Sequence, residues 1–172
     1  MKSLFIDLLE YAFIVTLIGV ITFLLIGQIL IIEGDSMLPN FKDGEQLIAE
    51  KVSLKFKDLQ RGEVVILKHP IENKLIIKRI IGLPGETVII SNGKVYVDGV
   101  ELNEPYLPPD TITKGRENYK IEENKYVVLG DNRQRSSDSR EWGLVDIKKI
   151  TGRGFLIYYP AQEMRFVNPT SL

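Results

Sequence analysis

The sequence contains no cysteine and a single histidine, His69. Without cysteine the chain has no disulfides, no thiol nucleophile and no cysteine-ligated zinc. One histidine cannot build a multi-histidine metal site, so we expect neither a metal ion nor a cofactor. Any chemistry has to come from hydroxyls, carboxylates, lysines or arginines.

An excess of basic residues is also missing, because 22 lysines and arginines stand against 23 aspartates and glutamates and leave a net charge of −1. Binding to nucleic acid depends mainly on basic side chains that neutralise phosphates. We therefore expect no nucleic-acid partner. The length of 172 residues suits one domain with a sizeable core.

Charge is absent from residues 11–32, which read "YAFIVTLIGVITFLLIGQILII". A run of about 20 apolar residues matches the hydrocarbon core of a bilayer at 1.5 Å rise per residue. The run predicts a transmembrane anchor and therefore a lipid bilayer as a partner. It follows a short segment, residues 1–10, and precedes a soluble domain, residues 33–172.

Two other interpretations of this apolar run are weaker. A cleavable signal peptide has a shorter apolar region and a small-x-small cleavage site, whereas this run ends "ILIIEGDS" without Ala-x-Ala. A buried core helix normally keeps a polar face. The flanking charges do not decide the orientation, because Lys2 lies on the same side as Asp7 and Glu10.

The rest of the chain is typical of a mainly β fold. After Phe41, short runs rich in valine, isoleucine and tyrosine alternate with glycine, proline, asparagine and aspartate. Asn92-Gly93 between two such runs indicates a two-residue hairpin. Residues 101–124 contain three prolines and little periodicity, and predict an irregular excursion or small cap. The predicted strands are 45–52, 63–68, 74–82, 86–91, 94–99, 125–130 and 151–159.

One predicted strand carries an unusual lysine. Alternation along residues 74–82 places Lys78 between Ile76 and Ile80 on one face. Burial there would disfavour the ammonium form and lower the lysine pKa, and a neutral lysine can act as a general base. Alternatively, Lys78 extends to solvent from an edge strand or pairs with a carboxylate.

Two polar segments could complete a site with this lysine. "EGDSMLPN", residues 33–40, places Ser36 directly after the apolar run, and "GDNRQRSSDSREWG" covers residues 130–143. A serine hydroxyl is a poor nucleophile until a base takes its proton, and a Ser-Lys pair is one known solution. The second segment is either a solvated loop or a loop that fixes an Asp-Arg pair and turns serine hydroxyls inward.

Four segments in this order resemble the sequence boxes of bacterial type I signal peptidases: "GDSMLP" (34–39), "RGEVVIL" (61–67), "KRIIGLPGE" (78–86) and "GDNRQRSSDSR" (130–140). The resemblance implies a membrane-bound serine endopeptidase that removes signal peptides from exported preproteins through an acyl-enzyme. It implies a preference for small residues at −1 and −3. It also implies a β-rich catalytic domain on the extracytoplasmic side of the cell membrane, with a variable excursion at 83–124 and residues 1–10 in the cytoplasm.

The resemblance also assigns roles to residues. Ser36 would be the nucleophile and Lys78 the general base. Ser136 would hydrogen-bond the lysine amine, and Asp138 and Arg140 would form a supporting ion pair. Residues expected to shape the site are Gly130, Asp131 and Asn132, and those expected to line the shallow substrate pockets are Leu30, Ile32, Met37 and Ile77.

Two positions depart from the family pattern. Gly34 stands where some members have a serine whose hydroxyl lines the oxyanion hole, which leaves the second oxyanion donor unidentified. Asn40 stands where threonine is usual, and we expect a modest effect.

Other functions stay open at this point. A dedicated Ser-Lys peptidase for one precursor would use the same residues, as would a self-cleaving repressor, although a repressor needs a DNA-binding domain and we expect none ahead of Ser36. A Ser-His hydrolase would use His69, but the proline after it favours a turn. An inactive relative could hold preproteins without cutting them, although the presence of both Ser36 and Lys78 disfavours this.

Overall fold

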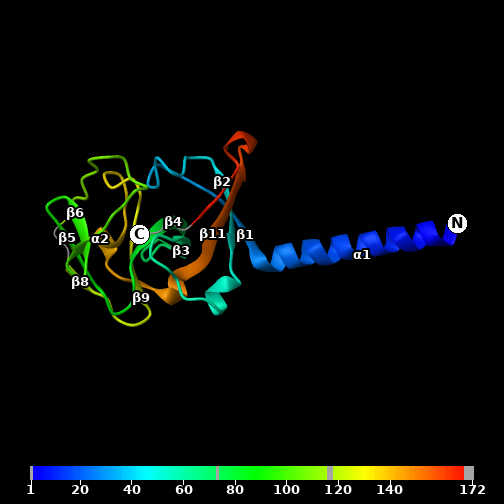
Figure 1. Ribbon diagram of the computed structural model, residues 1–172, viewed down its shortest axis with the longest axis horizontal. Coiled ribbons are helices and arrows are strands. Elements are labelled where there is room, and N and C mark those ends of the chain that lie inside the picture. Colours follow the sequence, from blue (N-terminus) through cyan, green and yellow to red (C-terminus); the bar gives the residue numbers. More distant parts are fainter. Residues whose placement is uncertain (1, 73, 116–117, 169–172) are drawn as a thin grey trace.

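The computed structural model describes residues 2–72, 74–115 and 118–168. A long N-terminal helix leads into a domain built mainly of strands (Figure 1). The elements are α1 (Lys2–Ile26), β1 (Gly27–Ile31), β2 (Gln46–Glu50), η1 (Ser53–Lys55), β3 (Val64–Lys68), β4 (Leu75–Gly82), β5 (Thr87–Ser91), β6 (Lys94–Val97), β7 (Val100–Glu101), β8 (Asn118–Lys120), β9 (Lys125–Leu129), α2 (Ser139–Trp142), β10 (Val145–Asp146), η2 (Ile147–Lys149), β11 (Ile150–Tyr159), η3 (Ala161–Glu163) and β12 (Arg165–Phe166).

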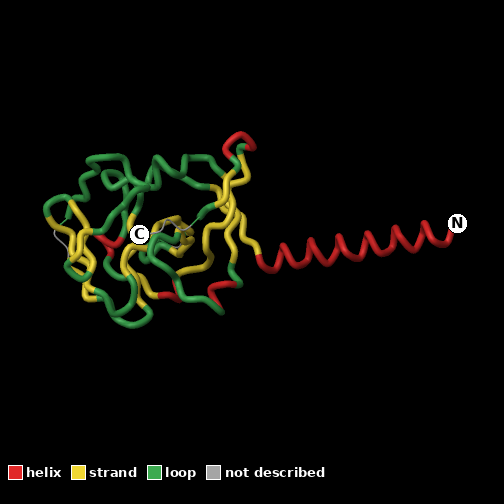
Figure 2. The backbone as a smooth tube through the Cα atoms, in the orientation of Figure 1, coloured by secondary structure: helices red, strands yellow, loops and turns green. Residues whose placement is uncertain are grey.

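The strands form two antiparallel sheets, which confirms the mainly β prediction (Figure 2). The larger sheet has the order β1-β2-β11-β3-β4-β9-β10, and β12 pairs with β11. The smaller sheet has the order β7-β6-β5-β8. Because β3, β4 and β9 are neighbours at the centre of the large sheet, segments far apart in the sequence meet there.

All seven predicted strands are present with slightly different ends. Asn92 and Gly93 have φ values of 51° and 80° in the β5–β6 hairpin, as a turn with two positive φ angles requires. The segment predicted to be an irregular excursion is more ordered than expected. It supplies β8, which pairs with β5, so the small sheet lies within residues 83–124.

The apolar run at residues 11–32 is not a single element. Helix α1 ends at Ile26, and Gly27–Ile31 forms β1, which pairs with β2 from Gly27↔Glu50 to Ile31↔Gln46. The predicted end of the anchor at residue 32 is therefore wrong for the helix, because glycine is a poor helix former and the isoleucines that follow suit a strand. Within the described residues, none of the helices combines the length and apolarity that crossing a membrane requires.

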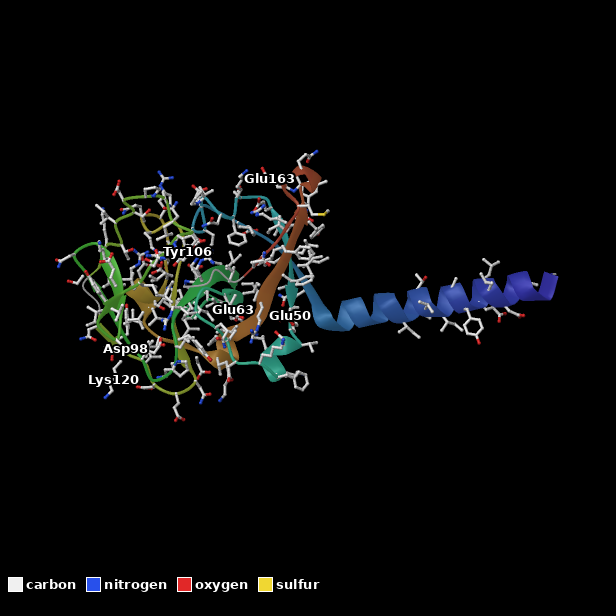
Figure 3. All side chains as sticks on the ribbon, in the orientation of Figure 1. Glu50, Glu63, Asp98, Tyr106, Lys120 and Glu163 are labelled. Carbon is white, nitrogen blue, oxygen red and sulfur yellow. The ribbon has the colours of Figure 1, made fainter. Side chains whose placement is uncertain are left out.

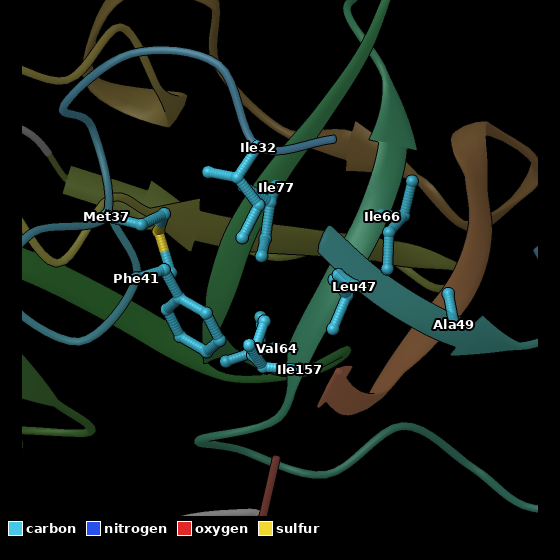
Figure 4. Packing of buried hydrophobic residues seen from close by; sticks show 9 residues of the cluster. All are labelled: Ile32, Met37, Phe41, Leu47, Ala49, Val64, Ile66, Ile77 and Ile157. Carbon is cyan, nitrogen blue, oxygen red and sulfur yellow. The ribbon is translucent and has the colours of Figure 1, made fainter. Parts of the chain in front are cut away.

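A buried cluster fixes the loop that follows β1 to the large sheet (Figure 4). Ile32, Met37 and Phe41 of this loop are at most 4% exposed. Each buried side chain of this size contributes about 1.5 to 3 kcal/mol relative to exposure. Ser36 therefore lies on a loop in which apolar residues before and after it are buried. The sheet residues in the cluster are Leu47, Ala49, Val64, Ile66, Ile77 and Ile157.

Candidate active site

Lys78 and Ser36 are in direct contact. Lys78 lies on β4, opposite Val65 of β3, and is only 3% exposed. Its Nζ donates hydrogen bonds to Ser36 Oγ at 2.8 Å and to the Ile77 carbonyl oxygen at 3.0 Å. The buried-face interpretation of the strand is confirmed, because the side chain does not reach solvent.

Burial lowers the pKa of Lys78 from its usual 10.5 to about 8. The negative charges of Asp138 and Asp131 oppose this change, and the positive charge of Lys74 reinforces it. The pKa is lowered overall because desolvation, which disfavours the ammonium form, is the largest of these effects. With a pKa near 8, about one lysine in ten is neutral at pH 7 and able to accept a proton.

The loop after β9 holds the backbone around Ser36. The Asn132 N–H donates to the Ser36 carbonyl oxygen at 3.0 Å, and Asn132 Nδ2 donates to the Asp35 carbonyl oxygen at 3.0 Å. At Gly130 a Cβ atom would lie 2.4 Å from the Ser36 carbonyl oxygen and 2.1 Å from Ser136 Oγ. The close approach of the two loops therefore requires glycine at position 130.

Asp138 and Arg140 also lie together, at the start of α2. Arg140 donates through Nε at 2.8 Å and Nη2 at 2.7 Å to the Asp138 carboxylate, which is fully buried and also accepts the Gly130 N–H at 3.0 Å. Burial on its own would raise the pKa of Asp138, but the hydrogen bonds and charge of Arg140 outweigh it and hold that pKa below its usual range. Arg140 Nη1 further donates to the Arg133 carbonyl oxygen at 2.7 Å, which connects α2 to the loop that precedes it.

Two other buried arginines, which sequence reasoning missed, clamp the same loop. Arg79 donates to Asp131 through Nε at 2.8 Å and Nη2 at 2.6 Å, and its guanidinium lies 4.0 Å from the Tyr106 ring centroid. Arg133 pairs with Glu104 and donates to the Gly130 carbonyl oxygen at 3.1 Å. Alternation on the predicted strand 74–82 was the available signal for Arg79, since it places Arg79 on the face opposite Lys78.

Asn40 also belongs to this network. Its Nδ2 donates to Asp131 Oδ2 at 2.8 Å and to the Tyr106 carbonyl oxygen at 2.8 Å. The residue that departs from the family pattern therefore links the Ser36 loop to the Arg79–Asp131 pair. Gly34 has a φ of 81° and donates its N–H to Asp43 Oδ1 at 2.6 Å, and it supplies no side-chain oxyanion donor.

Ser136 does not make the hydrogen bond that was expected of it. Its Oγ is buried beside Asp138, and the hydrogen bonds of Lys78 go to Ser36 and Ile77 instead. The side chain packs against Gly130 beside the Ser36 backbone. Ser136 is thus adjacent to the site, but the predicted contact with the amine is absent from this structure.

An apolar groove of about 440 Å³ runs from Ser36 between β1 and the first residues of β4. Of the four residues expected to contact substrate, Leu30, Ile32 and Ile77 line this groove. Met37 does not line it, because its side chain is fully buried in the cluster that fixes the loop. The prediction for Met37 is therefore corrected: its position next to Ser36 directs it into the core.

His69 lies in the loop between β3 and β4. Its Nδ1 accepts the N–H groups of Ile71 at 3.3 Å and Glu72 at 2.9 Å. The hydroxyl of Ser36 receives its hydrogen bond from Lys78. The geometry therefore favours a lysine over a histidine as the partner of Ser36.

Comparison with known proteins agrees with a hydrolase that uses a serine nucleophile. Residues 5–159 match the family model described as "Signal peptidase, peptidase S26". A signal peptidase I from Bacillus licheniformis is 37% identical over 163 residues, covering 87% of this chain and 88% of its own. A probable signal peptidase I-2 from Synechocystis is 39% identical, covering 86% of this chain and 69% of its own.

A solved structure is also similar. The crystal structure of a signal peptidase I from Enterococcus faecalis is 32% identical with a TM-score of 0.51, covering 56% of this chain and 97% of its own. The fold and the matches define the chain as a serine peptidase. The chain belongs to the signal peptidase family, peptidase S26.

Proposed function

We propose that the protein is an endopeptidase that removes signal peptides from exported preproteins, with Ser36 as nucleophile and Lys78 as general base. The observation that carries the proposal is the 2.8 Å hydrogen bond between Lys78 Nζ and Ser36 Oγ at a buried lysine whose pKa is lowered to about 8. A Ser-Lys pair of this kind activates a hydroxyl without histidine.

In the proposed reaction, neutral Lys78 takes the proton from Ser36 Oγ as that oxygen attacks the carbonyl carbon of the scissile bond. The Lys78 ammonium then gives its proton to the leaving amine, and an acyl-enzyme remains on Ser36. Lys78 is neutral again and activates a water molecule that hydrolyses the ester. Gly130, Asp131, Asn132, Asp138 and Arg140 act as positioning residues that hold the Ser36 backbone and the loop beside it.

The substrate class follows from the groove. An extended peptide fits between β1 and residues 75–77 of β4, where main-chain hydrogen bonds can add a strand to the sheet. The small volume and the apolar side chains of Leu30, Ile32 and Ile77 suit small residues at −1 and −3.

We further propose that the catalytic domain works at the extracytoplasmic surface of the cell membrane, held there by the uncharged N-terminal run. Support comes from apolar side chains exposed on strands near the end of α1. Ile29 and Ile31 of β1 are 54% and 55% exposed, and Phe155 and Phe166 lie in edge contact on β11 and β12 at 48% and 64% exposure. A tethered enzyme meets membrane-bound substrate at high effective concentration.

Ser36→Ala tests the nucleophile. We expect the purified protein to cut a preprotein whose signal ends in Ala-x-Ala, and the variant to lose at least about 10³-fold of that activity, since the acyl-enzyme cannot form. Gel analysis of the two fragments, with their new N-terminus determined, measures the reaction. Ser91→Ala, in the small sheet, is the matched control and should cut normally. A wild-type protein that leaves the preprotein intact would contradict the peptidase proposal.

The pH dependence of kcat/KM tests the base. Because Lys78 must be neutral to accept a proton, activity should be full above its pKa of about 8 and fall tenfold per pH unit below it. Lys74→Gln removes a like charge that lowers this pKa, and should move the midpoint to higher pH. Lys120→Gln, in the small sheet, should leave the midpoint in place. A rate that stays constant down to about pH 5 would show that another group is the base.

A further inference from the structure

A second cavity, of about 410 Å³, lies against the Ser36–Lys78 pair. It shares Glu33, Ser36, Lys74 and Ile76 with the apolar groove, so the two form one continuous depression that passes the nucleophile. Apart from these shared residues and β4, which contributes to both, the groove is formed by β1 and Ile32, whereas the cavity is formed by the β3–β4 loop, Ser137 and α2. The cavity-specific residues include His69, Glu72, Ser137, Glu141 and Trp142.

The wall of this cavity is held in place by its own contacts. The rings of His69 and Trp142 meet edge to face with centroids 5.8 Å apart. Two backbone N–H groups fix the His69 ring through Nδ1. Trp142 Nε1 donates to Ser137 Oγ at 3.2 Å, and the Ser137 hydroxyl donates to Glu141. A ligand would therefore meet a surface that is already ordered, which lowers the entropy cost of binding.

The cavity is also negatively charged. Of its three carboxylates, Glu72 pairs with Lys74. Within the part of the chain that the structure describes, Glu33 and Glu141 form no ion pair, and Glu141 accepts only a neutral hydroxyl. Lys78, the remaining cation, is mostly neutral above its pKa of about 8. The active form of the site therefore has uncompensated negative charge on this side of Ser36.

A peptide cut at Ser36 extends in two directions from the scissile bond. The apolar groove suits the signal-peptide side, so the polar cavity is left for the other side. Resting on the proposed function, we propose that this cavity binds the first residues of the mature chain. Glu33 and Glu141 make it favour a basic over an acidic side chain there, because an acidic side chain would approach two like charges.

Two matched peptides test this subsite. They share one signal sequence ending in Ala-x-Ala and differ only in having lysine or glutamate at the first two positions after the cleaved bond. At about pH 9, where Lys78 is mostly neutral, and low ionic strength, we expect wild type to cut the lysine peptide with a kcat/KM about five-fold higher or more. The Glu33→Gln/Glu141→Gln variant should reduce this ratio toward one, and Glu123→Gln, a distant exposed carboxylate, should preserve it.

Salt and the −1 position separate this effect from general damage. Raising the salt to about 0.5 M should weaken the lysine preference of wild type, because exposed charges are screened. The discrimination between alanine and leucine at −1 should be the same in wild type and the double variant, since the apolar side chains that line the groove, Leu30, Ile32 and Ile77, are unchanged. If the ratio of kcat/KM for the lysine peptide to that for the glutamate peptide is equal in wild type and the double variant, or if wild type prefers glutamate, the subsite is overturned while the peptidase proposal stays intact. Failure to cut either peptide would overturn both.

Discussion

Lys78→Met is expected to stabilise the fold at pH 7 by about 2 kcal/mol while reducing cleavage by about 10²-fold to 10⁴-fold. The difference between the usual lysine pKa of 10.5 and about 8 in the folded chain corresponds to about 3 kcal/mol of cost for keeping the ammonium buried. Methionine keeps most of the side-chain volume without the charge. The loss of the hydrogen bonds to Ser36 and Ile77 offsets about 1 kcal/mol of the gain.

The size of this stabilisation depends on pH in a way that identifies its cause. Between about 8 and 10.5 the unfolded chain binds the Lys78 proton more tightly than the folded chain, so wild-type stability rises with pH there relative to the variant. Urea unfolding should therefore show the advantage of Lys78→Met shrinking by about 1 kcal/mol between pH 7 and pH 9. Lys120→Met replaces an exposed lysine at the edge of the small sheet (Figure 3) and should change stability by less than about 0.5 kcal/mol. A Lys78→Met variant that is less stable than wild type at pH 7, by an amount that does not change with pH, would contradict the lowered pKa.

Asp131→Ala is expected to destabilise the fold by about 3 to 5 kcal/mol, because it leaves the buried Arg79 guanidinium without its carboxylate. The two side chains are 4% and 1% exposed, so the pair is shielded from solvent in the folded chain. Asp131 also accepts the hydrogen bond from Asn40, so the Ser36 loop should loosen as well. Urea unfolding measures the free energy of unfolding, and kcat/KM for cleavage of a preprotein measures the effect on the Ser36 loop.

An exposed ion pair provides the control for this substitution. Lys94 and Glu101 pair at 55% and 50% side-chain exposure, and Glu101→Ala should cost less than about 1 kcal/mol. Replacing Arg79 and Asp131 together by apolar residues of similar volume should recover much of the stability, since the unpaired charge is then gone. Equal costs for Asp131→Ala and Glu101→Ala would show that burial of the pair is not what makes it important.

The sequence by itself determined the strands and the Asn92-Gly93 hairpin, and it offered burial of Lys78 as one of two alternatives, between which the structure decided. These features depend on local chemistry: alternation, β-branching and positive-φ turns act over a few residues and can be recognised without the fold. The four ordered segments also placed Ser36 and Lys78 in one family pattern. Membership of the signal peptidase family agrees with that pattern.

Only the tertiary structure decided what depends on pairing between distant segments. The composition of residues 27–31 suits a strand as well as the end of an apolar helix, and they form β1 because β2 offers them a partner strand. Met37 enters the core and not the groove, and Ser136 packs on Gly130 and makes no hydrogen bond to Lys78, because loop positions are set by contacts across the sheet. The Arg79–Asp131 pair joins residues 52 apart, and the charged cavity gathers the β3–β4 loop and α2. Such contacts are decided by register and packing, which no local sequence pattern encodes.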